Sequence, residues 1–126
     1  MRPQVAIIGG GMITHDQILP SLYHMQRQGV IGEISVCALT GAPLRDLAQS
    51  ETLKRAFPGQ SFKPYPALED DGKHPDLFRE VIAGLPPRQV VVVAVPDQLH
   101  YDTIMTALRH DQHVLAVKPL VLKAAQ

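Results

Sequence analysis

The chain has 126 residues, 45% of them hydrophobic, and its twelve basic and twelve acidic side chains cancel. This length and composition suit one folded domain, and the lack of net charge argues against nucleic acid or an anionic membrane as a partner. No apolar run approaches the ~20 residues that span a bilayer, and the start of the chain lacks the apolar core of a signal peptide. The single cysteine, Cys37, excludes an intrachain disulfide, so we expect a cytoplasmic protein.

The first predicted element is a strand over Val5–Ile8, followed by a glycine-rich turn from Gly9 to Thr14. Gly9 would allow a tight turn, and Gly11 would let phosphate oxygens approach the backbone N–H groups of the next helix, which predicts a pyrophosphate-binding turn. The pattern departs from G-x-G-x-x-G at its last position, where Thr14 either widens the packing or places a hydroxyl near a phosphate. The alternative is a turn that uses glycine only for its conformation.

A helix over residues 12–28 and a strand over 34–39 are expected next, with a kink of the helix at Pro20. The strand ends at Thr40, where many dinucleotide-binding domains carry an acidic residue for the adenosine ribose. Because that acid is missing and Arg45 follows in the next helix, Arg45 could bind the 2′-phosphate of NADP. Both NAD and NADP remain open, and the alternative for Arg45 is a solvated surface residue.

The middle of the chain adds elements rather than candidate site residues. We expect a helix over residues 44–57, a short strand over 61–65 and a helix over 75–83 that begins at its proline. Pro64 places the strand at a sheet edge, because proline cannot donate to a ladder of hydrogen bonds. The polar stretch 66–74 is predicted to be an irregular, exposed loop.

The clearest strand is predicted over residues 89–95, which contain four consecutive valines, and a helix follows over 100–110. Ligands of open α/β sheets bind outside the carboxyl ends of the strands, so Pro96, Asp97 and His100 are placed near a cofactor. Asp97 is expected to cap the helix. His100 either donates a hydrogen bond to a ligand or is a helix residue without a chemical role.

A last strand, predicted to be buried over residues 113–117, leads into Lys118 and Pro119. Lys118 would lie at the same sheet edge as the glycine turn, where its ammonium could bind a substrate oxygen and donate a proton if its pKa were lowered. A lysine before a proline is otherwise typical of the surface. No histidine or cysteine spacing is typical of a metal site, so no metal is expected.

Strands that alternate with helices predict an α/β fold of the Rossmann type, with a doubly wound parallel sheet in three layers. We expect residues 1–126 to form a single NAD(P)-binding domain. If nothing follows the last strand, its apolar edge near Val114–Val117 would be exposed and would make the chain self-associate.

Three motifs occur in order: the strand followed by GGGMI (residues 9–13), AVPDQLH (94–100) and VKPLVL (117–122). Together they resemble the nucleotide-binding half of the Gfo/Idh/MocA oxidoreductases, the glucose-fructose oxidoreductase and inositol dehydrogenase family, over essentially the whole chain. The resemblance implies that Met12 and Ile13 of the first motif, with Pro96 and His100, line the cofactor pocket. It also implies that Lys118 lies near the nicotinamide and assists proton movement, although Val117 replaces the glutamate that typically precedes this lysine.

The resemblance further implies hydride transfer between the nicotinamide and a sugar or polyol-like alcohol. Members of the family carry a C-terminal α/β domain that holds substrate residues and often mediates oligomerisation. We therefore expect a truncated domain of a homo-oligomeric enzyme that turns over little by itself. A non-catalytic NAD(P)-sensing or interaction module is the alternative that the imperfect glycine motif favours, whereas the Lys118-Pro119 motif argues against an S-adenosylmethionine-dependent methyltransferase.

Overall fold

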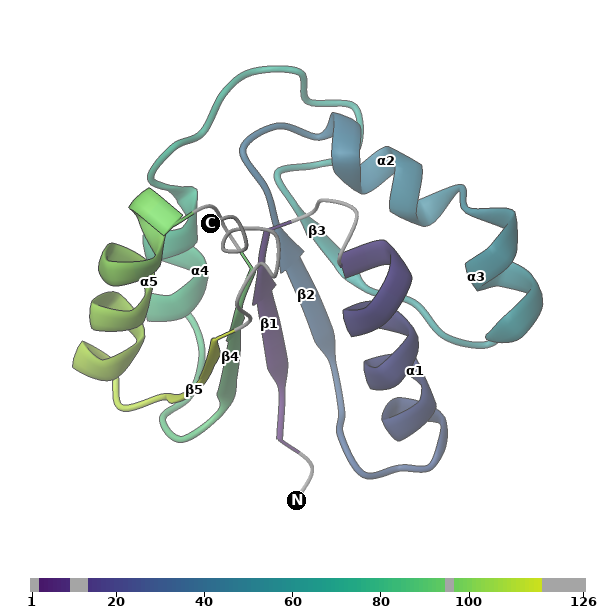
Figure 1. Cartoon of the computed structure of the whole chain (residues 1–126), viewed down its shortest axis with the longest axis horizontal. Coiled ribbons are helices and arrows are strands. Elements are labelled where there is room, and N and C mark those ends of the chain that lie inside the picture. Colours follow the sequence, from purple (N-terminus) through teal and green to yellow (C-terminus); the bar gives the residue numbers. More distant parts are fainter. Residues whose placement is uncertain (1–2, 10–13, 95–96, 117–126) are drawn as a thin grey trace, which may run out of the picture.

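Within the described residues, five parallel strands form one sheet in the order β3-β2-β1-β4-β5. The strands are β1 (Val5–Ile8), β2 (Ile34–Cys37), β3 (Lys63–Tyr65), β4 (Val90–Val93) and β5 (His113–Ala116). This computed structural model describes residues 3–9, 14–94 and 97–116, the side chains of residues 97–100 excepted. From β1 the chain builds the sheet outward through β2 to β3, then returns to the other side of β1 for β4 and β5 (Figure 1). The predicted doubly wound parallel sheet is confirmed.

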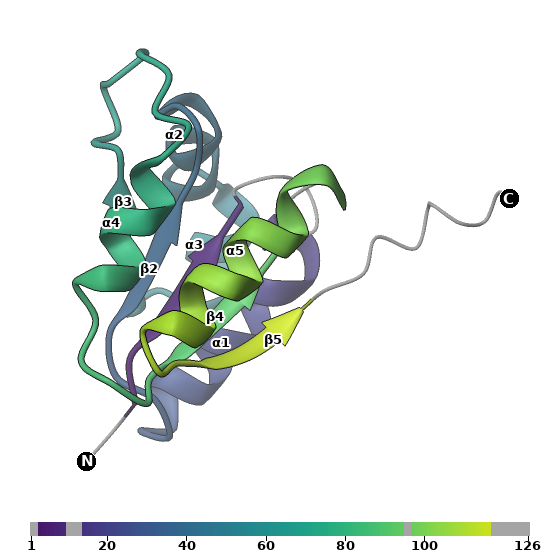
Figure 2. The ribbon, with the colours of Figure 1, turned by 90° about the vertical axis from the view of Figure 1, so that its left-hand side faces the viewer.

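Helices cover the sheet on both faces (Figures 1 and 2). One face carries η1 (Thr14–Ile18), α1 (Leu19–Arg27), α2 (Ala42–Ala48) and α3 (Glu51–Ala56), and the other carries α4 (Leu77–Ala83) and α5 (Asp97–Arg109). Successive side chains of a strand point to opposite faces, so Ile7 packs against the α1 layer and Ile8 against the α4 layer. Two apolar cores, one on each face, thus hold three layers together.

The first predicted helix is divided near its proline. A π-helix, η1, ends at Ile18, and α1 begins at Leu19 with Pro20 in its first turn. An N–H in the first turn of an α-helix has no partner within the helix, so proline costs no hydrogen bond there. The sequence predicted a kink at Pro20. In the structure, the helix changes from π-helical to α-helical geometry between Ile18 and Leu19.

The second predicted helix, over residues 44–57, is also two helices, and the prediction of one continuous helix was wrong. Ser50 between α2 and α3 has an extended backbone, and its hydroxyl accepts a hydrogen bond from the Leu53 N–H at 3.3 Å. Serine is a good N-cap and an indifferent interior residue, which explains the break. The same hydroxyl lies 2.7 Å from His15 Nε2, which ties η1 to α3.

The two edge strands are β3 and β5. Pro64 does place β3 at an edge, as predicted. The prediction that the last strand is buried was wrong: Val114 packs against the core of the α4 layer, but Leu115 is 59% exposed. Only Val114, which pairs with Val91 of β4, packs in a core, so the apolar composition of β5 does not reflect cover on both faces.

We expect the outer edge of β5 to make the chain self-associate at high concentration, because an exposed apolar strand edge pairs readily with another chain. Leu115→Lys places a charge on this edge and should lower the average mass measured by light scattering. Thr52→Lys, at an exposed position of α3, is the control and should leave the mass unchanged. A parent chain that stays monomeric at the highest soluble concentration would contradict this expectation.

Candidate functional site

The carboxyl ends of β1 and β4 mark the point where the sheet reverses its winding direction. Gly9 follows β1, and its N–H donates to the Cys37 carbonyl at 2.7 Å. Ala94 follows β4, and its N–H donates to the Ile8 carbonyl at 2.8 Å. Both ladders therefore continue one residue beyond the strands, and the two chain segments leave the sheet side by side. Ligands of open parallel sheets bind at such a point.

Gly9 occupies a position that no other residue fits. Its φ of +123° lies in a region that L side chains rarely adopt, and a Cβ added there would lie 2.2 Å from the Ala94 carbonyl oxygen. The missing side chain lets the turn after β1 approach the end of β4. A tight turn directly after the first strand is what a dinucleotide-binding domain requires of its first glycine.

Thr14 closes the same turn from the other end. Its side chain is fully buried, and its hydroxyl donates to the Gly9 carbonyl at 2.8 Å. The start of η1 is therefore tied back to the end of β1. The hydroxyl that stands in place of the last glycine of the motif is used inside the turn, where it satisfies a backbone oxygen.

Thr14→Val should lower the free energy of unfolding by about 1–2 kcal/mol, because it leaves the Gly9 carbonyl without this donor at nearly constant volume. Thr14→Ser keeps the hydroxyl and should restore part of the hydrogen bond. Urea unfolding of the three proteins measures the difference. Equal stability of the valine variant and the parent chain would show that the hydrogen bond does not hold the turn.

A loop between β3 and α4, residues 66–76, arches across the carboxyl edge of the sheet (Figure 1). It is irregular and largely exposed, as predicted, yet its backbone is bonded to the segment that follows β2. The Gly41 N–H donates to the Asp70 carbonyl, and the His74 N–H donates to the Leu39 carbonyl, both at 2.8 Å. A Cβ on Gly41 would lie 2.5 Å from the Ala67 carbonyl oxygen. The β3–α4 loop thus closes over the end of β2.

Asp70 gives the β3–α4 loop its shape. One carboxylate oxygen accepts the Gly72 N–H at 2.8 Å, and the other lies 2.9 Å from His74 Nε2. The hydrogen bond from Gly72, with a smaller contribution from His74, holds the pKa of Asp70 below its ordinary value, so the carboxylate stays charged at neutral pH. Sequence reasoning missed this residue, although an aspartate two residues before a glycine is a recognised turn signal.

Thr40 and Arg45 both follow the end of β2. Thr40 is half-buried and precedes Gly41, while Arg45 lies on α2. The Arg45 guanidinium donates to the Leu68 carbonyl at 2.5 Å and pairs with Asp71 at 2.8 Å. Arg45 is therefore bonded to the β3–α4 loop rather than free in solvent.

Several predicted site residues stay predictions. The residues outside the described part of the chain are Gly11, Met12, Ile13, Pro96 and Lys118. His100 lies in the first turn of α5, and its side chain is not described. Because α5 begins at Asp97, its amino-terminal end lies just beyond β4 at the same sheet edge, where backbone N–H groups favour an anion.

The described residues do not support nucleophilic catalysis by cysteine or the binding of a metal ion. Cys37 is 3% exposed, and burial raises the pKa of its thiol to about 12, so it is uncharged and unsuited to nucleophilic attack. No group of three or more histidine, cysteine, aspartate or glutamate side chains is placed to hold a metal ion in the described ranges. None of the helices in these ranges is both long and apolar enough to cross a membrane.

The geometry of the β1 turn agrees with a comparison against protein families. The model of the Gfo/Idh/MocA family, described as an oxidoreductase family with an NAD-binding Rossmann fold, matches residues 4–126. The chain belongs to this family. The family identified from the three sequence motifs is confirmed, and membership sets aside the methyltransferase alternative. The family is one that binds a nicotinamide nucleotide, and the match does not distinguish NAD from NADP.

Solved structures show the same fold at low sequence identity. An oxidoreductase from Thermotoga maritima is 20% identical with a TM-score of 0.57, and a glucose-6-phosphate 1-dehydrogenase from Mycobacterium avium is 15% identical with a TM-score of 0.62. Each alignment covers 95% of this Gfo/Idh/MocA chain but only 31% and 30% of the two solved chains. No curated protein matches the chain.

Proposed function

We propose that the chain is the nucleotide-binding part of an NAD(P)-dependent oxidoreductase that acts on an alcohol carbon of a sugar or polyol-like substrate. The observation that carries this proposal is the Gly9 turn at the point where the sheet reverses its winding. No Cβ fits at Gly9, so the turn after β1 packs directly on the end of β4, which is the tight first turn that a dinucleotide-binding domain uses. Membership of the family supports the same reading.

We propose the roles of the individual residues from the sequence motifs and from the family to which the chain belongs. Gly9 and the amino-terminal end of the first helix, with Gly11, Met12 and Ile13, hold the pyrophosphate. Thr40 lies at the ribose, and Pro96 and His100 line the pocket beyond β4. When bound, the nicotinamide accepts or donates the hydride, while the protein positions the cofactor and substrate. Lys118 holds a proton at the substrate oxygen.

The contact between Arg45 and Asp71 supports a specific view of cofactor choice. An exposed ion pair contributes only about 0.2–1 kcal/mol, and a phosphate makes a stronger bidentate partner for a guanidinium. We therefore propose that the 2′-phosphate of NADP displaces Asp71 from Arg45, whereas NAD leaves this ion pair intact.

Thermal unfolding with NAD, NADP, NADH and NADPH tests both proposals. A nucleotide at 100 times its Kd should add about 2.7 kcal/mol of apparent stability. Asp71→Asn should enlarge the NADP shift alone, Arg45→Ala should abolish that gain, and Arg55→Ala on exposed α3 is the matched control. The absence of a shift with all four nucleotides would contradict cofactor binding, and equal effects of Asp71→Asn on NAD and NADP would contradict the role of Arg45.

A further inference from the structure

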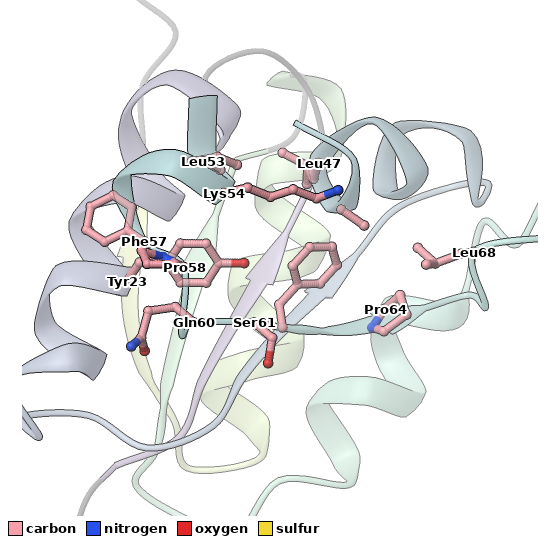
Figure 3. Close-up of a pocket in the computed structure, with 12 residues that line it drawn as sticks. Tyr23, Leu47, Leu53, Lys54, Phe57, Pro58, Gln60, Ser61, Pro64 and Leu68 are labelled. Atoms are coloured by element: carbon pink, nitrogen blue, oxygen red, sulfur yellow. The ribbon is translucent and has the colours of Figure 1, made fainter. Parts of the chain in front are cut away.

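A cavity of about 150 Å³ lies between α1, α3 and β3 (Figure 3). Its walls are mostly apolar side chains from both helices, the end of α2 and the segments flanking β3, among them Leu47, Leu53, Phe57, Phe62 and Leu68. A cavity of this volume lined by such side chains can hold a molecule the size of benzene.

Tyr23 is the polar group directed into this cavity. The residue is 5% exposed, and Figure 3 shows its hydroxyl pointing away from Phe57 toward the middle of the lining side chains. Among the residues that the structure describes, no hydrogen bond from this hydroxyl is found, and the hydroxyl is not among the fully buried polar atoms that lack a partner, so it is reached from the cavity. Burial raises the pKa of Tyr23 to about 12, so the hydroxyl keeps its proton as a donor. A ligand oxygen in the cavity would be within reach of this donor.

The ring of Tyr23 is held in place, so this donor is fixed before a ligand arrives. Its centroid lies 5.7 Å from that of Phe57 in a tilted arrangement. The Arg27 guanidinium covers the Phe57 ring at 4.9 Å from its centroid. A donor that needs no rearrangement favours binding, because less side-chain entropy is lost.

One charged side chain, the cation Lys54, is among the lining residues of the cavity. Lys54 of α3 lines it, is exposed, and has no ion-pair partner among the described side chains. No aspartate or glutamate is among the lining residues. An anionic group on a ligand would therefore be attracted by the Lys54 ammonium and would not be repelled by a carboxylate of the lining.

We propose that this cavity, whose lining does not include the Gly9 turn, is a second binding site for a small aromatic acid. The ring occupies the apolar space, the Tyr23 hydroxyl donates to the carboxylate, and the Lys54 ammonium balances its charge. An uncharged ring of the same size would gain the apolar contacts but would lose the attraction of Lys54.

Titration of the ¹⁵N-labelled 126-residue chain with benzoate, and separately with benzyl alcohol, tests this site. Saturable amide shifts are expected at Tyr23, Leu53 and Phe57, with tighter binding of benzoate. Tyr23→Phe should weaken benzoate by about tenfold, since it removes one hydrogen bond to a charged acceptor. Tyr101→Phe is the control, because Tyr101 is 71% exposed on α5 across the sheet.

A second pair of variants keeps the test decisive if Tyr23→Phe does not fold. Lys54→Gln should weaken benzoate by about threefold to fivefold without changing benzyl alcohol, as expected for a partly exposed charge pair. Lys73→Gln, at an exposed position of the β3–α4 loop, should change neither. Absence of saturation by benzoate, equal affinity for benzyl alcohol, or displacement of benzoate by NADH would each overturn the proposal.

Discussion

Gly9→Ala should lower the free energy of unfolding by about 3 kcal/mol, because backbone strain and a steric clash add at one position. The φ of +123° disfavours any side chain, and the new Cβ would lie 2.2 Å from the Ala94 carbonyl oxygen and 2.7 Å from its carbon. Both are backbone atoms of Ala94, whose N–H is hydrogen-bonded to the Ile8 carbonyl, so they cannot simply rotate away as a flexible side chain could. Urea unfolding followed by circular dichroism measures the effect.

Gly59→Ala is the matched control for this prediction. A Cβ on Gly59 would meet no atom within 4 Å, and its φ is not in the positive region. The control should therefore change stability by less than about 0.5 kcal/mol, as surface substitutions usually do. If both variants lose the same stability, the special geometry of the turn after β1 is not what Gly9 provides.

Gly41→Ala should lower the free energy of unfolding by about 1–3 kcal/mol, for a different physical reason. Its φ of −74° is ordinary, but a Cβ would lie 2.5–2.8 Å from three carbonyl oxygens of the β3–α4 loop. The loop would have to move away from the end of β2, which would break the bond between the Gly41 N–H and the Asp70 carbonyl. The backbone amide at position 41 should therefore exchange its hydrogen faster in the variant than in the parent chain.

Gly84→Ala provides the comparison, since its Cβ would make ordinary contacts of 3.4 Å or more at the end of α4. It should leave exchange at Gly41 unchanged. If Gly41→Ala kept both the stability and the slow exchange of the parent chain, the β3–α4 loop would not be packed on the end of β2 as the structure shows.

The sequence predicted the parts of the fold that local patterns determine. Val5–Ile8 and the valines of β4 are apolar runs bounded by turn residues, and Gly9 follows the first run directly. Their parallel pairing follows from the alternation of strands and helices. The family motifs added information about the cofactor edge that composition and periodicity do not contain.

Features that depend on contacts between distant segments were harder to predict. Ser50 ends one helix and caps another, but its neighbours on both sides favour helix, so the break was missed. The exposure of Leu115 depends on the strand order, which places β5 at an edge. The hydrogen bonds of Arg45 are made to a loop more than twenty residues away in the chain. The position of that loop depends on how the whole carboxyl edge of the sheet folds.

The most direct measurement is a titration of the ¹⁵N-labelled chain with NADH, followed residue by residue through its amide signals. Binding at the carboxyl edge predicts saturable shifts that centre on Gly9, Thr14 and Ala94, extend to Thr40, and disappear in Gly9→Ala but not in Gly59→Ala. Absence of saturation, or shifts confined to residues remote from the ends of β1 and β4, would contradict a nucleotide site at this edge.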